Sequence, residues 1–202
     1  VRRLSAAGVI TTVAGTGGAG GGGDGGPAVK AQLNGPQGLA LDNSGNLYIA
    51  DANNFRIRKV APDGTITSVA GGTRQEVYYG EGGAANDARV FLPYGLALDA
   101  EGTVYFSELR PGAIRRISRA GMIRTLKRIG YPGGVAVDPS GQLYLANQLA
   151  HNVLRVSPDG AAITVAGTGT RGFSGDGGPA IGAQLAWPTE VAADSSGNVY
   201  IA

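Results

Sequence analysis

The stretch that decides the fold runs from Pro36 to Gly71 and reads PQGLALDNSGNLYIADANNFRIRKVAPDGTITSVAG. Turn signals divide it into four short apolar runs, at residues 38–42, 47–50, 56–60 and 66–70. In the turn Pro62-Asp63-Gly64, proline presets φ and glycine accepts a positive φ. Four short runs separated by turns are typical of a four-stranded antiparallel meander.

The same pattern returns three times along the chain. A second copy, PYGLALDAEGTVYFSELRPGAIRRISRAGMIRTL, spans 93–126, and a third, PGGVAVDPSGQLYLANQLAHNVLRVSPDGAAITVAG, spans 132–167. A fourth, PTEVAADSSGNVYIA, covers 188–202. Four strands in a repeat of roughly 40 to 57 residues indicate the blades of a β-propeller.

The fourth copy holds only the first half of a repeat. Residues 1–15, VRRLSAAGVITTVAG, match residues 57–71, IRKVAPDGTITSVAG, and therefore supply a second half. We expect a single all-β domain over 1–202, a β-propeller of four four-stranded antiparallel blades with one blade assembled from both termini. The terminal strands can pair within one chain or between two, so the protein is expected to be a monomer or a homodimer through terminal-strand pairing.

Composition excludes several classes of site. The chain is 43% hydrophobic, enough to bury a core, and its zero cysteines remove disulfides, thiolate zinc sites and cysteine nucleophiles. No apolar run reaches the length of a membrane span, and the first residues lack the apolar segment of a signal peptide. A net charge of +2 is weak for a nucleic-acid binder, so we expect neither a membrane nor a nucleic-acid partner.

The repeats follow the pattern P-x-G-[LV]-A-[LV]-D-x-x-G-x-[LV]-Y-[IFL]-[AS], and an [IVL]-R-[KR]-[VIL] strand comes after it. This pattern resembles the NHL repeat over nearly the whole chain, and the GDGGPA loops between blades resemble those of bacterial NHL proteins. The resemblance implies a propeller, often of six blades, that serves as a platform for protein, RNA or carbohydrate-like ligands. Some related propellers are amidating lyases or gluconolactonase-like hydrolases. A secreted or surface protein, extracellular or periplasmic, is favoured.

Three junctions between blades carry inserts that align without gaps, and the junction at 127–131 lacks one. Their shared DGGPA core predicts structure, with the segment from Ala28 to Leu33 forming a helical turn that packs Leu33 on the blade beneath. The variable parts, 73–81 and 170–174, are better candidates for binding. The candidate ligand-binding residues are Arg74, Tyr78, Tyr79, Arg171, Phe173 and Trp187.

The sequence predicts no metal and no cofactor. One carboxylate per insert is too few for calcium, and the single histidine, His151, cannot build a zinc site without further ligands. The glycine-rich GTGGAGGGGDGG is not followed by the Lys-Ser/Thr of a phosphate-binding loop. The equivalent aspartates predict Asx-type turns after the first strand of each blade: Asp42, Asp99, Asp138 and Asp194.

Two further functions stay open beside a non-catalytic binding or scaffold propeller that presents loops on one face to a protein or glycan ligand. One is a lyase or hydrolase with a divalent-metal site in the central channel. Its candidate carboxylates are Glu190, facing the channel, and Glu108 and Glu76 near the rim, although no residue is assigned as catalytic. The other is a self-assembling propeller fragment without a ligand.

Overall fold

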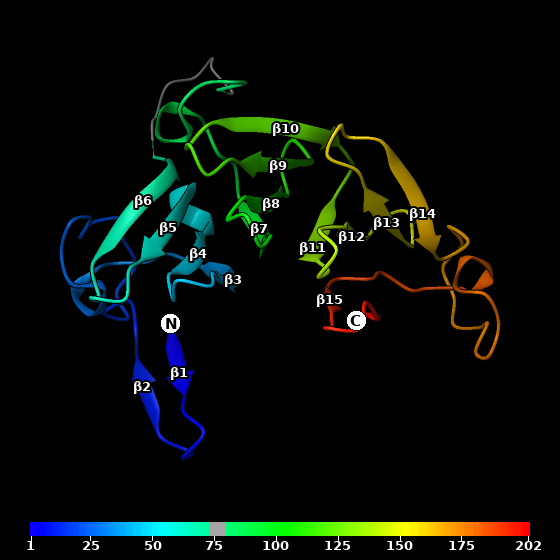
Figure 1. The fold of residues 1–202 in the computed structure, drawn as a ribbon, viewed down its shortest axis with the longest axis horizontal. Coiled ribbons are helices and arrows are strands. Elements are labelled where there is room, and N and C mark those ends of the chain that lie inside the picture. The colour runs from blue at the N-terminus through cyan, green and yellow to red at the C-terminus, as the bar shows by residue number, and fades with distance from the viewer. Residues whose placement is uncertain (73–79) are drawn as a thin grey trace.

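A computed structural model describes residues 1–72 and 80–202 as an arc of antiparallel β-sheets, open on one side (Figure 1). Three sheets are complete four-stranded blades. Blade 1 contains β3 (Pro36–Leu41), β4 (Leu47–Asp51), β5 (Arg56–Val60) and β6 (Ile66–Gly71). Blade 2 contains β7 (Pro93–Leu98), β8 (Val104–Glu108), β9 (Ala113–Ile117) and β10 (Ile123–Arg128). Blade 3 contains β11 (Pro132–Val137), β12 (Leu143–Asn147), β13 (Asn152–Val156) and β14 (Ala162–Ala166).

The two ends of the chain form two separate two-stranded sheets. The N-terminal half-blade is β1 (Arg2–Leu4) with β2 (Ile10–Thr12), and the C-terminal half-blade is β15 (Val191–Ala193) with β16 (Val199–Ile201). The all-β propeller architecture is confirmed. The chain differs from the expectation in one respect, because its termini do not join into a fourth blade. They lie on the two sides of the open arc in Figure 1.

Strand register gives the molecule two distinct faces. In blade 1, Pro36 pairs with Asp51, Asp51 with Arg56, and Arg56 with Gly71, so these residues lie level at one end of the sheet. The connections from second to third strand and from blade to blade therefore share one face, here called the loop face. The connections from first to second and from third to fourth strand share the opposite face, here called the turn face.

The turn face carries the equivalent aspartates, which form the predicted turns. Asp42 accepts hydrogen bonds from the backbone nitrogens of Ser44 (2.9 Å) and Asn46 (2.8 Å), and Asp194 does the same for its own turn. Partial burial opposes ionisation of Asp42, but the hydrogen bonds from Asn46 and Ser44 outweigh it and lower the pKa of this carboxyl. These aspartates hold turns together, as their sequence context predicted.

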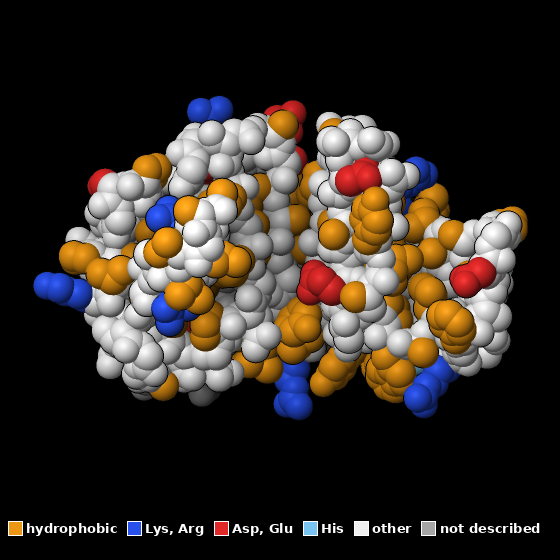
Figure 2. Space-filling model, turned by 90° about the horizontal axis from the view of Figure 1, so that it is seen from below, with side chains coloured by type: hydrophobic (Ala, Val, Ile, Leu, Met, Phe, Trp, Pro, Cys, Tyr) orange, Lys and Arg blue, Asp and Glu red, His pale blue; other side chains and the backbone are white. Residues whose placement is uncertain are grey.

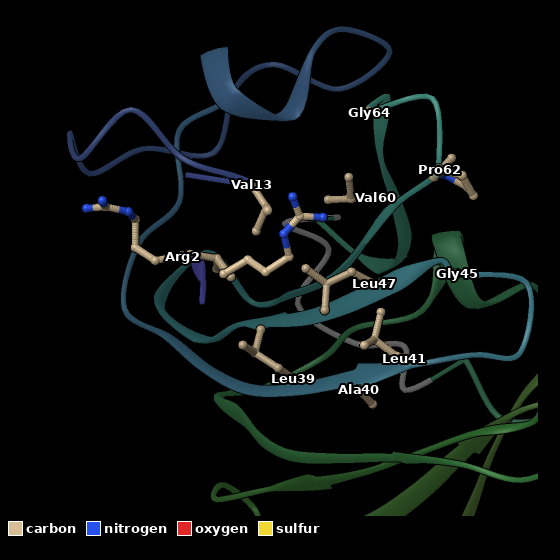
Figure 3. A pocket seen from close by; sticks show the side chains of 13 residues that line it. Arg2, Val13, Leu39, Ala40, Leu41, Gly45, Leu47, Val60, Pro62 and Gly64 are labelled. Carbon is tan, nitrogen blue, oxygen red and sulfur yellow. The ribbon is translucent and has the colours of Figure 1, made fainter. Parts of the chain in front are cut away.

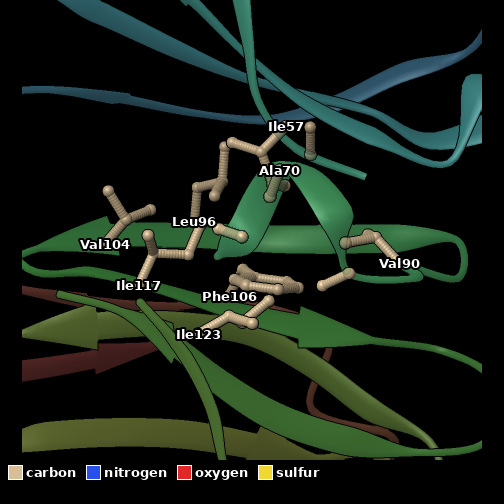
Figure 4. Packing of buried hydrophobic residues seen from close by; sticks show 11 residues of the cluster. Ile57, Ala70, Val90, Leu96, Val104, Phe106, Ile117 and Ile123 are labelled. Carbon is tan, nitrogen blue, oxygen red and sulfur yellow. The ribbon is translucent and has the colours of Figure 1, made fainter. Parts of the chain in front are cut away.

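Apolar side chains fill the space between neighbouring blades. Figure 4 shows the cluster between blades 1 and 2, in which Phe106 is fully buried. Its members come from both blades and from the intervening insert: Ala50, Ile57, Ala70, Ala85, Ala88, Val90, Leu96, Val104, Phe106, Ile117 and Ile123. Blade 2 has two buried faces because it is sandwiched between blades 1 and 3, and its strand β8 is buried along its whole length.

The first strands of adjacent blades approach closely through glycine. A Cβ added to Gly38 would lie 2.3 Å from the Tyr94 carbonyl oxygen, and one added to Gly95 would lie 2.7 Å from the Gly134 Cα. Any side chain at these positions would push the blades apart. The equivalent position in the C-terminal half-blade holds Glu190, whose carboxylate lies against Gly134.

The inserts pack as structural elements. The first forms the 3₁₀ turn η1 (Ala28–Lys30) and places Ala28, Ala31 and Leu33 in the core beside Ile66, which confirms the predicted helical turn. The equivalent turns η3 (Ala85–Asp87) and η4 (Ala180–Gly182) occupy the other two inserts. A further turn, η2 (Ala52–Asn54), connects β4 to β5.

A buried arginine ties each of the first two inserts to its blade. Arg58 is fully buried, and its Nη2 lies 2.7 Å from Asp24 of the insert, while its Nη1 lies 3.4 Å from the buried Asp51. Arg115 of blade 2 repeats this arrangement, with Glu81 at 3.7 Å and Glu108 at 3.4 Å. Blade 3 follows the junction without an insert, and at the two equivalent blade positions it has Leu154 and Asn147.

Candidate ligand-binding face

Strained backbone marks the loop face. Among the residues that the structure describes, all non-glycine residues with positive φ lie on it: Phe55 (57°), Leu92 (39°), Tyr131 (56°), His151 (51°) and Trp187 (54°). A left-handed conformation costs a residue with a side chain about 1–2 kcal/mol. Residues held in such conformations cluster at functional sites, so this row makes the loop face the first candidate for binding.

The strained residues occupy two recurring positions. Leu92, Tyr131 and Trp187 each precede the proline that starts a blade, where the first full blade has Gly35 (φ 59°). Phe55 and His151 lie in the connection between second and third strands, where blade 2 has Gly112 (φ 87°). Glycine adopts this backbone without strain. The other blades instead carry mostly large side chains there.

His151 and Trp187 form a pair across the boundary between blade 3 and the C-terminal half-blade. The Trp187 backbone N–H donates to His151 Nδ1 at 3.1 Å, so the proton of the neutral imidazole is on Nε2. The two rings meet edge to face, with centroids 5.2 Å apart and planes at 85°. The pair is therefore held in one geometry while Trp187 stays 42% exposed.

A second aromatic pair bridges blades 1 and 2. The rings of Phe55 and Phe91 meet edge to face at 6.3 Å, and the Arg89 guanidinium carbon lies 4.1 Å from the centre of the Phe91 ring. Phe55 is 45% exposed, and Tyr131, at the next boundary, is 46% exposed. The loop face thus presents aromatic side chains at three successive blade boundaries.

Three of the predicted binding residues lie in or next to the third insert. The backbone of Arg171 forms an isolated β-bridge with Leu185, two residues before Trp187. The side chains of Arg171 and Phe173 are exposed, that of Phe173 by 91%. Arg74, Tyr78 and Tyr79 lie outside the described residues. Sequence reasoning missed Phe55, Phe91, Tyr131 and His151 as members of this face. Gly35 and Gly112 stand at the equivalent positions of other blades. Aligning the repeats on these glycines is the sequence signal that would have identified the left-handed positions.

The channel carboxylates do not gather into a catalytic or metal site. Partial burial raises the pKa of Glu190. Glu108 lies at the loop-face end of β8, near the rim, but its side chain is buried. Desolvation, only partly offset by Arg115, raises its pKa to about 7. Glu76 lies outside the described residues. Within residues 1–72 and 80–202, no group of three or more His, Asp or Glu is placed to hold a metal ion, so the proposed channel metal finds no fitting ligand set there.

Comparisons with known proteins support the repeat type and the fold. The family model of the teneurin NHL domain matches residues 12–78. Human teneurin-1 is 31% identical over 104 residues, which cover 46% of this chain and 4% of teneurin-1. Virginiamycin B lyase of Nocardia farcinica is 28% identical over 191 residues, covering 82% of this chain and 66% of the lyase. The chain thus spans a small part of the teneurins and about two thirds of the lyase.

Solved structures agree on the fold. Virginiamycin B lyase of Staphylococcus aureus superposes with a TM-score of 0.61 at 15% identity, over 99% of this chain and 55% of the lyase. A chain in the structure of a nidogen/laminin complex gives 0.58 at 20% identity, over 85% of this chain and 73% of that chain. No helix among the described residues is long and apolar enough to cross a membrane.

Proposed function

We propose that this NHL-repeat β-propeller is a binding module that presents its loop face to a protein ligand. The observation that carries the proposal is the row of exposed aromatic side chains on left-handed backbone at successive blade boundaries. Tyrosine, tryptophan and arginine supply most of the binding energy at protein interfaces. Tyr131, Trp187 and Arg171 provide these residue types on one face.

The rigidity of this face favours binding further. His151 fixes the Trp187 backbone through a hydrogen bond and the Trp187 ring through an edge-to-face contact. An aromatic ring held before the ligand arrives loses little conformational entropy on binding. The backbone strain at the left-handed positions is then the energetic cost of holding these aromatic rings in a fixed orientation.

One comparison supports a protein ligand, because a similar fold belongs to a complex of two proteins, nidogen and laminin. Similar folds also belong to virginiamycin B lyases, which keep a catalytic role as the second candidate. A glycan ligand remains the other expectation from the sequence, and the experiment below separates the two.

The test immobilises the chain and probes it with a phage-displayed peptide library and with a glycan array. We expect selected peptides whose affinity falls at least tenfold in Trp187→Ala and Tyr131→Ala. Met122→Ala serves as the matched control, because Met122 is 44% exposed on the turn face. Peptides that lose affinity only in Met122→Ala, or binding confined to the glycan array, would refute the proposal.

A lyase is the second candidate, and it is favoured by the single histidine on the same face. His151 accepts a hydrogen bond from the Trp187 backbone N–H through Nδ1, which fixes the orientation of the imidazole ring. A catalytically inactive S. aureus virginiamycin B lyase in which a histidine is replaced by alanine was solved with quinupristin. Incubating this chain and His151→Ala with quinupristin, followed by chromatography, tests this candidate. Unaltered quinupristin with the unmodified chain would rule out that substrate.

A further inference from the structure

We propose that the outer edge of β14 in blade 3 is a docking site for an extended segment of a protein partner, which adds to the blade as a further strand. This edge is separate from the loop face, so the site does not depend on the proposed loop-face function. Blades 1 and 2 already carry such an added segment, supplied by their own inserts, and blade 3 does not.

The first insert adds a short extended segment to the outer strand of blade 1. The Ile66 N–H donates to the Gly26 carbonyl oxygen (3.0 Å), and the Ile66 carbonyl oxygen accepts from the Gly25 N–H (2.8 Å). The Ala28 N–H donates to the Gly64 carbonyl oxygen (2.8 Å), and in Figure 3 the helical turn of the insert lies beside Gly64. These bonds close the outer edge of β6 with a peptide segment.

The second insert repeats this pattern on β10 of blade 2. The Ile123 N–H donates to the Gly83 carbonyl oxygen (2.9 Å), and the Ile123 carbonyl oxygen accepts from the Gly82 N–H (2.8 Å). Two residues further along the strand, the Thr125 N–H donates to the Glu81 carboxylate at 2.8 Å. The backbone groups that point outward from β10 at these positions therefore have partners in the insert.

The same edge of β14 has no such partner. Ala162 lies opposite Val156 and so occupies the position of Ile66, which means that its N–H and C=O point away from β13. Thr164, two residues further along, has the same orientation. Among the described residues, β14 pairs with β13 alone, and no hydrogen bond joins the outward backbone groups of Ala162 or Thr164 to another segment.

This edge is open because the junction at 127–131 lacks an insert. The junction lies between two complete blades, so the open edge of β14 does not arise from either half-blade. In Figure 1, β14 lies on the outer rim of the arc, away from the open side that Figure 2 shows. Blade 2 covers only the start of the edge, because a Cβ added to Gly160 would lie 2.1 Å from the Leu126 carbonyl oxygen. A docked segment can therefore pair from Ala162 onward.

The sequence of β14 also lacks the features that protect an exposed edge. Proteins commonly protect edge strands with charged side chains, with proline or with a covering segment. The strand β10 has the covering insert and also Arg124 and Lys127, whereas β14, with the sequence AITVA, contains neither a charged residue nor a proline. Its backbone is therefore available to an extended chain, in the mode of recognition in which main-chain hydrogen bonds supply affinity.

Blade 3 also specifies the side chains that a docked segment can carry. In blade 1, the buried Arg58 holds the insert acid Asp24 and the strand acid Asp51. Blade 3 has Leu154 at the arginine position and Asn147 at the position of the strand acid. An acid of the segment facing Leu154 would lose water without gaining a cation. The segment is therefore expected to be uncharged where it pairs with β14.

Two exposed cations flank this edge. Arg155 precedes Val156 on β13 and lies opposite Ile163 of β14, and Lys127 follows Leu126 at the start of the edge. A segment with acidic residues at its ends complements these charges, whereas a second copy of the chain would bring like charges together. The expected partner is thus an extended segment with an uncharged middle and acidic ends.

The experiment titrates the chain with a fluorescein-labelled heptapeptide, Glu-Thr-Val-Thr-Val-Thr-Glu, which combines residues of high strand propensity with acidic ends. We expect saturable binding by fluorescence polarisation, and weaker binding of the same peptide with lysine ends. In the complex, deuterium exchange is expected to slow at the Ala162 and Thr164 amides and to stay unchanged at Ile66. Trp187→Ala is expected to bind this peptide as tightly as the unmodified chain, which separates the β14 edge from the loop face.

A proline at Ala162 tests the backbone contact directly. Ala162→Pro removes an N–H that points outward, a change that an edge strand tolerates. We expect the peptide to bind about tenfold more weakly because one backbone hydrogen bond is lost, with little change in urea unfolding. Ala162→Ser keeps the N–H and serves as the matched control with unchanged binding. Ile66→Pro is expected to destabilise the chain, because the Ile66 N–H already bonds to Gly26.

Three results would overturn the proposal. One is the absence of heptapeptide binding at millimolar concentration. Another is equal peptide affinity in Ala162→Pro and Ala162→Ser. The third is slow exchange of the Ala162 and Thr164 amides before any peptide is added. Slow exchange that depends on the concentration of the chain would assign this edge to a second copy instead of a partner.

Discussion

Arg58 shows how much a single residue contributes to the attachment of an insert. Its guanidinium is fully buried between Asp24, from the insert, and Asp51, at the end of β4. Burying a charge is costly unless it is paired, and the pair is costly to break from one side. The arginine therefore makes the insert and the blade depend on each other.

Replacing Arg58 with leucine, the residue that blade 3 has at this position, is expected to destabilise the chain by about 3–5 kcal/mol, because Asp51 is left buried without its cation. Urea unfolding measures the change. The combined variant with Asp51→Asn reproduces the Leu154 and Asn147 pair of blade 3 and is expected to recover part of the loss. Equal stability of the single and double variants would contradict this account.

Glu108 makes stability depend on pH. Burial raises its pKa from 4.5 to about 7, so folding favours the protonated form. This contribution is fully present below pH 4.5 and is lost as the pH rises through 7, an effect of up to about 3 kcal/mol between pH 5 and pH 8. Glu108→Gln does not titrate, and its unfolding free energy is expected to stay flatter over this range. A pH dependence identical to that of the unmodified chain would show that another group is responsible.

Some residue roles could be read from the sequence and others could not. The aspartate turns at Asp42 and its equivalents follow from local chain chemistry, and local chemistry is visible in a sequence. Glu108 does lie at the loop-face end of its strand, but its burial depends on what packs over it from another strand and from the insert, and the sequence did not show this. Phe55 and Tyr131 were missed because a sequence shows glycine at left-handed sites more clearly than it shows phenylalanine or tyrosine.

At the scale of elements, the inserts act as packed additions to the blades. Their helical turn was predictable because two alanines and one aliphatic residue, Ala28, Ala31 and Leu33 in the first insert, recur at equivalent places in all three. The contacts between the first insert and strands β5 and β6 could not be predicted. They depend on Asp24 contacting Arg58 and Ser68, which lie 34 and 44 residues away in sequence.

Gly23 is the point at which the first insert folds back on itself. Its φ is +99°, and an added Cβ would lie 2.7 Å from the Ala31 Cα. Gly23→Ala is therefore expected to cost about 1–3 kcal/mol more than Gly25→Ala in urea unfolding. Gly25 is the matched control, since it has a positive φ of +79° but no neighbour within 4 Å of the added Cβ. Equal losses of unfolding free energy in the two variants would show that the positive φ alone, and not the contact with Ala31, determines the destabilisation.

At the scale of the whole molecule, the repeats predicted the blades but not the closure of the ring. Strand pattern and turn residues are local, and they gave three complete blades in the expected places. Closure depends on how adjacent first strands pack. Contacts such as Gly95 on Gly134 set that packing, and a repeat alignment does not reveal their geometry. Within the described residues, β1 with β2 and β15 with β16 form two separate sheets.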